Sequence, residues 1–417
     1  MQLKTLLNFV EEHKGFVYDG FKLNRRRPRP TLLVRVRPAK GRKGICSRCR
    51  TPGPTYDTLH ERRYQFVPLW GIAVFFLYAM RRISCGRCKR VIVEAVSWAT
   101  GKQTITTSFA WFLAGWAQRM SWKEVARAFH VTWDTVFAAV KVAVEYGLAH
   151  RTLDDVEVLG VDEVMWQRCG RKFLTVVYAL DEGRRRLLWI GQERTEAALR
   201  SFFDWFGGNA RNLRAVASDM WQPFLNVIRE RVPWALSVLD RFHIVAGVHR
   251  AVDEVRRSEA AELTRRGETV LKHKRWIFLK SPENLSEPQA AKLADLVKAN
   301  LRTVRAYLLK EELRQLWDLF SPARACLFLT GWCRRARRSK LKPLARVAKT
   351  LEKKADLILN WFRAGGAISS GAVEGLNNKL KIIIRRAYGF RSYDVTSTAL
   401  YHALGKLPEP PLIHRFH

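Results

Sequence analysis

The spacing of apolar and polar positions divides the chain into strand-like and helix-like regions. Residues 31–36 alternate like a strand, and residues 58–84 read as a hairpin. Apolar residues recur at helical spacing in residues 104–147 and again from about 244 to 360. The pattern predicts a multidomain α+β protein. A small β module is followed by a helical segment, then by a region of strands and helices, and then by a second helical segment.

The mixed region has a definite order of predicted elements. Three successive strands are followed by a helix, a strand, a second helix and a last strand; the predicted strands are residues 156–162, 173–180, 186–191, 213–218 and 235–239. The first helix is predicted over residues 196–206, with Thr195 as its cap and Gly207 and Gly208 at its end, and the second over roughly residues 222–231. This is the order of a ribonuclease-H-like fold, so we expect an α/β core of that type, interrupted by a helical insertion before a final helix within residues 368–391.

These regions divide the chain into five predicted segments, two of which belong to one core. The predicted boundaries are 1–100 for an N-terminal arm and zinc-binding module, 101–152 for a helix-turn-helix domain, 153–257 for the first part of the core, 258–365 for the insertion, and 366–417 for the last core helix and tail.

Net charge narrows the choice of partner. The chain has 74 Lys and Arg against 38 Asp and Glu, a formal charge of +36, which favours a polyanion such as nucleic acid. A membrane surface is the competing partner, but the longest apolar run, Val67 to Met80, has 14 residues and is too short to span a bilayer. No signal peptide is visible, so we expect a cytoplasmic, nucleoid-associated bacterial protein. Residues 22–43 carry ten basic residues and no acid, and are either a solvated arm or a phosphate-contacting one.

Four cysteines occur as two CxxC pairs, Cys46 with Cys49 and Cys85 with Cys88. Each pair presents two thiolates to one ion, and two pairs complete a tetrahedral four-thiolate site. In a chain without an export signal, metal is favoured over disulfides. We therefore predict one structural zinc ion; four reduced thiols without metal are the alternative.

A helix-turn-helix motif is predicted in residues 121–144. Ser121 and Glu124 form a capping box that opens one helix, and Thr132 can cap the next. The early residues of a second helix of this kind enter the major groove of DNA. A plain helical hairpin is the alternative. The residues expected to contact DNA are Lys123, Arg127, Thr132, Trp133, Thr135 and Lys141.

Three carboxylates are the candidate catalytic residues. Asp162 and Asp219 each end a predicted strand, and Glu374 lies on the predicted last helix. Asn377, Lys381 and Arg385 fall close to the same helix face as Glu374, and Lys381 and Arg385 are placed to meet phosphates. Grouped carboxylates need cations, and oxygen-only ligation suits Mg²⁺ or Mn²⁺. Two such ions about 3.5–4 Å apart can activate a nucleophile and stabilise the leaving oxygen of a phosphodiester. Strand alternation makes Glu163 a weaker candidate.

Asp240 and His243 are further candidates for active-site support. Asp240 ends the last predicted strand and could be a ligand, or could orient its neighbours. His243, three residues later, is more often a structural histidine than a metal ligand.

The order of motifs resembles that of insertion-sequence DDE transposases of the ISL-three group. The resemblance rests on the paired CxxC motifs, the helix-turn-helix, GVDE, SDMW, LDRFH and EGLNNK followed by RRAYGF, and it extends from about Cys46 to the last helix. It implies a ribonuclease-H-like catalytic domain with its triad at Asp162, Asp219 and Glu374. It also implies that the zinc module and the helix-turn-helix bind terminal inverted repeats. The implied reaction is hydrolytic release of a 3′-hydroxyl at each end and its attack on target DNA.

The resulting hypothesis is a metal-dependent DNA transposase that acts as a homodimer or larger assembly, since two DNA ends must be joined. Two alternatives stay open on the sequence. One is a zinc and helix-turn-helix transcription regulator whose carboxylates serve only structure. The other is a structure-specific nuclease on the same fold.

Overall fold

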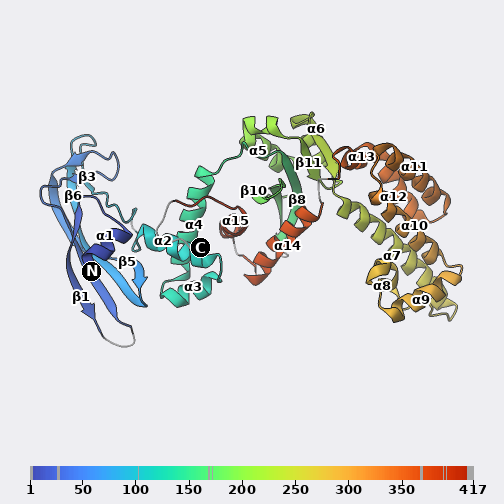
Figure 1. The fold of residues 1–417 in the computed structure, drawn as a ribbon, viewed down its shortest axis with the longest axis horizontal. Coiled ribbons are helices and arrows are strands. Elements are labelled where there is room, and N and C mark those ends of the chain that lie inside the picture. The colour runs from blue at the N-terminus through green and yellow to red at the C-terminus, as the bar shows by residue number, and fades with distance from the viewer. Residues whose placement is uncertain are drawn as a thin grey trace. The chain divides into compact units, whose positions relative to one another are not determined.

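The computed structural model describes residues 3–25, 29–101, 103–167, 170, 172–366, 370–387, 389–390 and 392–410. Two compact units divide the chain, one formed by residues up to 151 together with those from Tyr401, the other by residues 152–400 (Figure 1). The chain has a mixed α/β architecture with more than one sheet.

The first unit combines a curved sheet with a small group of helices. The sheet runs in the order β1-β2-β6-β5, with β7 paired to β6. Its elements are α1 (Leu3–Val10), β1 (Phe16–Asn24), β2 (Thr31–Pro38), β3 (Gly44–Ile45), β4 (Pro52–Gly53), β5 (Thr55–Leu69), β6 (Ile72–Cys85), β7 (Arg90–Val93), α2 (Thr107–Ala117), α3 (Trp122–Phe129) and α4 (Trp133–His150).

One hydrophobic core joins the sheet and the helices of this unit. Trp98 is fully buried, and the rings of Phe16 and Tyr78 pack against it with centroids 4.7 and 5.2 Å away. The same cluster of buried side chains continues into α2 and α4. Residues 1–100 and 101–152, expected as two domains, therefore share a core. The expected N-terminal arm lies largely in the strands β1 and β2.

The second unit is built on a five-stranded sheet in the order β10-β9-β8-β11-β12. The strands β10, β9 and β8 form an antiparallel meander, whereas β8, β11 and β12 are parallel. The elements up to the last strand are β8 (Val158–Gln167), β9 (Lys172–Ala179), β10 (Arg186–Gln192), α5 (Glu196–Phe206), the 3₁₀ helix η2 (Gly207–Asn212), β11 (Ala215–Ser218), α6 (Gln222–Arg231) and β12 (Leu236–Leu239).

Helices cover both faces of this sheet. Phe202 and Phe206 of α5 and Phe224 of α6 pack with Leu159 and Val161 of β8 on one face. On the other face lies α14 (Ser370–Arg386), which contacts β8 (Figure 1). The predicted element order of this region is present, and the helices α5 and α6 have the expected bounds.

A helical bundle follows β12. It consists of α7 (Arg241–Arg265), α8 (Arg275–Leu279), η3 (Pro282–Asn284), α9 (Glu287–Lys298), α10 (Arg302–Arg314), η4 (Gln315–Asp318), α11 (Pro322–Arg338), α12 (Lys342–Lys353) and α13 (Ala355–Arg363). α7 runs without a break through the expected boundary at 257/258. The core of the bundle includes Leu225 of α6 and Leu239 of β12, and Asn360 of α13 donates a 2.8 Å hydrogen bond to the carbonyl of Ser237 in β12. The insertion therefore packs onto the sheet rather than forming a separate compact unit.

The last helix, α15 (Tyr393–Leu404), contains the division between the two units. Leu407 belongs to the core of the first unit, where a Cβ added at Gly147 would lie 2.4 Å from the Leu407 Cβ. The expected domain 366–417 is thus divided, because apolar contacts of the segment after α15 attach it to α4.

Candidate functional site

Three aspartates lie at the same level along neighbouring parallel strands. Ser218 of β11 pairs with Val161 of β8 and with Leu239 of β12. The residues that follow these three are Asp162, Asp219 and Asp240. Equivalent positions on parallel strands face the same side of a sheet, so the three carboxylates share one face.

The sequence pattern predicted that Asp162 ends its strand. In the structure Asp162 lies within the strand β8. β8 continues to Gln167 because Glu163 to Gln167 pair with β9, whereas pairing with β11 stops at Val161. Asp162 therefore lies where β8 stops pairing with β11 but continues to pair with β9.

A hydrogen-bonded relay holds the Asp162 carboxylate. The backbone N–H of Glu163 donates to Oδ1 at 2.7 Å, and the Asn377 amide of α14 donates to Oδ2. The Tyr178 hydroxyl donates to the Asn377 Oδ1 at 2.8 Å. Asp162, Asn377 and Tyr178 are all buried. The relay therefore connects β9, α14 and β8 through groups whose hydrogen bonds water cannot replace.

Asp219 is held by a second set of contacts. Its Oδ1 accepts a 3.0 Å hydrogen bond from the backbone N–H of Trp221, and its Oδ2 accepts one of 3.2 Å from Arg194. The Arg194 guanidinium lies 4.4 Å from the centroid of the Trp221 ring and also pairs with Glu163. Glu163, the weaker candidate, is thereby linked to Asp219 through one arginine.

The supporting residues Asp240 and His243 lie beside Asp162. Asp240 caps α7 by accepting a 2.8 Å hydrogen bond from the Phe242 N–H. The Nε2 atom of His243 lies 3.9 Å from a carboxylate oxygen of Asp162 and 3.9 Å from one of Asp240. His243 can thus offset the charge of both acids when it is protonated.

Glu374 is exposed on α14, one residue after Val373, which packs on the sheet. Close approach of α14 depends on Gly160, where an added Cβ would lie 2.9 Å from Val373 Cγ2. Lys381 and Arg385 are exposed on the same helix, as expected. Asn377, expected on that polar face, instead turns toward Asp162 and is buried.

Burial and mutual repulsion raise the pKa values of Asp162, Asp240 and Glu163. Burial raises the pKa of Asp162, and the charge of Asp219 adds to the shift, against the Glu163 N–H and His243. Burial likewise raises the pKa of Asp240 to about 6, with contributions from Asp162 and Glu374. The pKa of Glu163 rises to about 7 for the same main reason. A cluster of this kind favours a bound cation or a proton.

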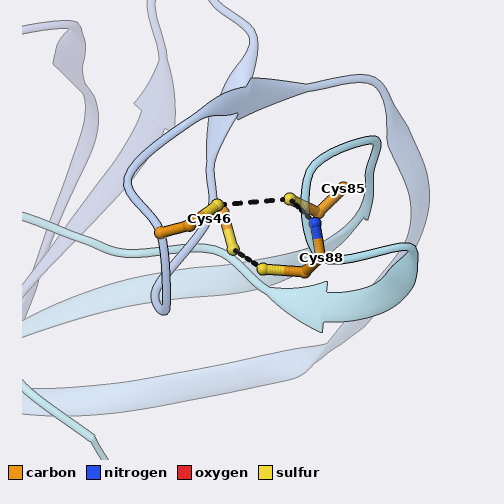
Figure 2. A group of neighbouring side chains, drawn as sticks. Cys46, Cys85 and Cys88 are labelled. Carbon is orange, nitrogen blue, oxygen red and sulfur yellow. Dashed lines mark hydrogen bonds between the residues drawn. The ribbon is translucent and has the colours of Figure 1, made fainter.

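Among the described residues, three or more possible metal-ligand atoms lie within 4.8 Å of one another only at Cys46, Cys49, Cys85 and Cys88. The acids Asp162, Asp219 and Glu374 do not reach that separation. The side chains of Cys46, Cys85 and Cys88 point toward one another (Figure 2). Sγ–Sγ distances are 4.0 Å between Cys46 and Cys88 and 3.4 Å between Cys49 and Cys85. The structure thus brings together both predicted CxxC pairs.

The helix-turn-helix has the predicted local structure. Ser121 and Glu124 form the capping box of α3, and Thr132 caps α4 by accepting a 3.1 Å hydrogen bond from the Thr135 N–H. Their hydroxyls also bond to each other at 2.8 Å, so both threonines act within the protein. Trp133 packs against Phe137 with a centroid distance of 5.6 Å and is 40% exposed.

The cationic residues of the motif differ in exposure. Lys123 and Arg127 on α3 are exposed, whereas Lys141 on α4 is half-buried and lies 5.9 Å from the centroid of the Phe137 ring.

None of the helices in the described part of the chain is long and apolar enough to cross a bilayer.

Sequence reasoning did not identify Arg194, Tyr178 or the role of Asn377. Arg194 lies between β10 and α5 and belongs to no periodic pattern. Tyr178 reads as an ordinary strand residue. Gly160 was a usable signal, because a glycine inside a buried strand often marks the close approach of another element.

Neighbouring acidic strand positions, a helix-turn-helix and a large positive charge define an α/β protein that acts on nucleic acid. A family model described as transposase matches residues 159–400. The transposase for insertion sequence element IS1001 from Bordetella parapertussis is 31% identical over 374 residues, covering 88% of this chain and 90% of that protein. The transposase for IS1557 from Mycobacterium tuberculosis is 30% identical over 417 residues, covering 93% and 90%. The chain belongs to the ISL-three group of insertion-sequence transposases.

The protein is therefore a DNA transposase, an enzyme of DNA cleavage and strand transfer, and the regulator and nuclease alternatives are not favoured. A solved structure described as the Drosophila P element transposase strand transfer complex aligns with 73% of this chain and 93% of its own, at 8% identity and a TM-score of 0.40. A likeness of that size carries no argument about this chain.

Proposed function

We propose that this transposase cleaves and joins DNA at a site formed by Asp162, Asp219 and Glu374, acting as a DDE triad on a ribonuclease-H-like core. The observation that supports it best is the register of the sheet. Asp162 and Asp219 each follow directly after the paired residues Val161 and Ser218, and so lie level on one face. Glu374 comes from the helix that packs on that same face.

The donor set fits two Mg²⁺ or Mn²⁺ ions, because all three side chains offer oxygen and their crowded charges need neutralising. When bound, such ions activate the attacking oxygen and stabilise the leaving oxygen of a phosphodiester. Asp162 would contact both ions, and Asp219 and Glu374 one each. Moderate movement of Glu374, which is exposed, would be needed to close the site.

The remaining groups of the site hold the acids and the DNA. Asn377 fixes one oxygen of Asp162, and the other oxygen accepts the Glu163 N–H and lies 3.9 Å from His243 Nε2. His243 offsets the charge of Asp162 and Asp240. Lys381 and Arg385, exposed on α14 beyond Glu374, would contact backbone phosphates next to the reacting one.

DNA ends would be recognised by the first unit. Lys123, Arg127 and Trp133 are exposed in the helix-turn-helix and would contact the terminal inverted repeats. Zn²⁺ held by the four cysteines would fix the loops at the end of the sheet, as a structural site without an open coordination position.

Joining two ends requires at least two active sites or two bound ends, so we propose a homodimer or a larger assembly. The DNA partner is double-stranded, both as the element's ends and as the target. We propose that the protein acts in the cytoplasm, at the nucleoid.

The decisive experiment compares Asp219→Ala with the parent protein in DNA binding and in strand transfer with Mg²⁺ or Mn²⁺. We expect the variant to bind end DNA normally and to join nothing. Glu157→Gln is a control, because the Glu157 side chain is 47% exposed and the residue lies just before β8, at the end of the strand remote from Asp162. Normal strand transfer by Asp219→Ala would show that the catalytic assignment is wrong.

A further inference from the structure

One face of α7 leads away from the acidic site and becomes strongly cationic. His243, Arg250 and Arg257 are spaced by seven residues, so they drift by only ~20° per step and lie along one side of the helix. At ~1.5 Å per residue, Arg250 lies ~10 Å and Arg257 ~21 Å along the axis from His243. The face therefore connects a residue of the acidic site with two arginines farther out.

Small residues occupy the helix face between His243 and Arg250. Ala246 and Gly247 lie on the same face between His243 and Arg250. A Cβ added at Gly247 would meet no atom within 4 Å, so the helix surface is open there. A ligand can approach the backbone of α7 closely over this turn.

Beyond Gly247, α7 and α8 enclose a groove of about 620 Å³. The groove is lined by His249, Arg250, Asp253, Glu254, Arg256, Arg257, Arg275 and Leu279. A single carboxylate, Asp253, is shared by Arg256 at 2.8 Å, Arg257 at 3.4 Å and Arg275 at 3.5 Å. The other acid of the groove, Glu254, pairs with Arg346 of α12 at 2.6 Å. Four arginines and two carboxylates thus line the groove, and one of these carboxylates is already paired with Arg346 outside it.

A purely structural role does not account for this excess. Asp253 can link α7 to α8 with one arginine, yet the Arg257 and Arg275 side chains remain 67% and 53% exposed while they pair with it. Arg250 is exposed, and no ion pair to it is found within the described parts of the chain. These guanidinium groups are exposed enough to bind a polyanion from solvent.

We propose that this face of α7, with Arg275 of α8, is a binding track for the sugar-phosphate backbone of a DNA strand that leaves the catalytic centre. The proposal rests on the proposed function for the position of that centre. Phosphates of one B-DNA strand advance by ~3.4 Å along the axis, so Arg250 and Arg257 match phosphates roughly three and six nucleotides from the reacting one. The helical insertion thereby acquires a role in holding DNA, independent of base sequence.

The test measures DNA binding by an Arg250→Ala, Arg257→Ala double variant as a function of salt. The measurement is made in an Asp219→Ala background, so that no DNA is cut. Removing two arginine–phosphate contacts should reduce the magnitude of the slope of log K against log salt by about 1.8, because each contact contributes about 0.9 on B-DNA. Arg211→Ala is the control, since Arg211 is exposed in η2, which precedes the start of β11 at the other end of the sheet.

Substrate design locates the contact. Neutral methylphosphonate linkages are placed three and six nucleotides from the scissile phosphate, on the transposon side, on the flanking side or in target DNA. We expect the parent to lose affinity on one of these substrates only, and the double variant to be indifferent to that substitution. An unchanged salt slope, or equal losses on every substrate, would overturn the proposal.

Two controls keep the outcomes separable. Arg250→Ala alone breaks no ion pair found in the structure, so it reports on DNA binding even if the double variant folds poorly; it should reduce the slope by about 0.9. Binding is read without catalysis, so the track can fail while the Asp219 assignment holds. Conversely, strand transfer by Asp219→Ala would reject the assignment while leaving the binding result to stand.

Discussion

Replacing Gly160 by alanine should separate α14 from the sheet. The added Cβ would lie 2.9 Å from Val373 Cγ2 and 3.0 Å from Leu180 Cδ1. Non-bonded carbon atoms pack at about 3.5–4.0 Å, so either α14 or the Val373 side chain must move by about 0.6 Å or more. Valine is stiff at χ1 in a helix, and Val373 is only 3% exposed, so movement of the helix is the simplest relief.

The expected cost has two parts. Overpacking of this kind lowers the free energy of unfolding by roughly 1–3 kcal/mol. Movement of α14 also shifts Glu374 and Asn377 relative to Asp162, and a misplacement near 1 Å can lower a rate by about a hundredfold. We expect strand transfer to fall by about ten- to a hundredfold, measured at saturating end DNA, with urea unfolding recorded in parallel.

A second substitution tests the cause. Val373→Ala removes the methyl group that Gly160→Ala would meet, so the double variant should be more stable than the two single effects predict, by about 0.5–3 kcal/mol. Gly208→Ala is the matched control, because a Cβ added there meets nothing within 4 Å. The reasoning is refuted if Gly160→Ala matches the parent in stability and strand transfer, or if Val373→Ala gives no rescue.

Three further outcomes are expected. Cys85→Ser should lose the proposed zinc ion, so that atomic absorption finds less zinc per chain than in the parent; unchanged zinc content would count against the four-thiolate site. Tyr178→Phe leaves the buried Asn377 carbonyl without its donor and should cost about 1–3 kcal/mol in urea unfolding, together with slower strand transfer; equal values in both assays would show that the relay does not hold Asp162. Burial lowers the pKa of His13 to about 4, below its usual value near 6.5, so the unfolded chain takes up that proton first. The contribution of His13 to stability should therefore decline as pH falls from about 6.5 to about 4, whereas Glu11, whose pKa burial raises to about 7, contributes in the opposite direction. His13→Leu should remove the His13 contribution from pH-dependent urea unfolding, and an identical pH dependence in the variant would contradict it.

Much of the fold could be predicted because its signals are local. Helix starts were readable where a capping side chain precedes an apolar run, as at Ser121 and Thr195. The order of strands and helices along the chain in the second unit followed from the alternation between β-forming runs and helical spacing. The two CxxC pairs were equally local, and their convergence needed only the hairpin of β5 and β6 between them.

Domain boundaries were harder, because they depend on which apolar faces meet. The helical spacing of residues 104–147 does not reveal that α2 and α4 share a core with the sheet. The charge and spacing of α7 change little at residue 257, yet the helix belongs both to the acidic site at His243 and to the bundle. In each case the decisive contacts join segments that are distant along the chain.

The acids themselves were predictable, and the residues that hold them were not, for one physical reason. An acid at the end of an apolar run is unusual within its own sequence neighbourhood, whereas Tyr178 and Arg194 are ordinary where they stand. Helical arithmetic placed Asn377 with Glu374 and Lys381, because it counts angles around an axis and cannot know how deeply the helix sits. That depth is set by Gly160, whose missing side chain lets α14 approach until the amide of Asn377 reaches Asp162. A glycine beside a candidate catalytic acid therefore indicates that a second element closes over the acid, and the polar residue on the border of that element's buried face is the one to expect as its partner.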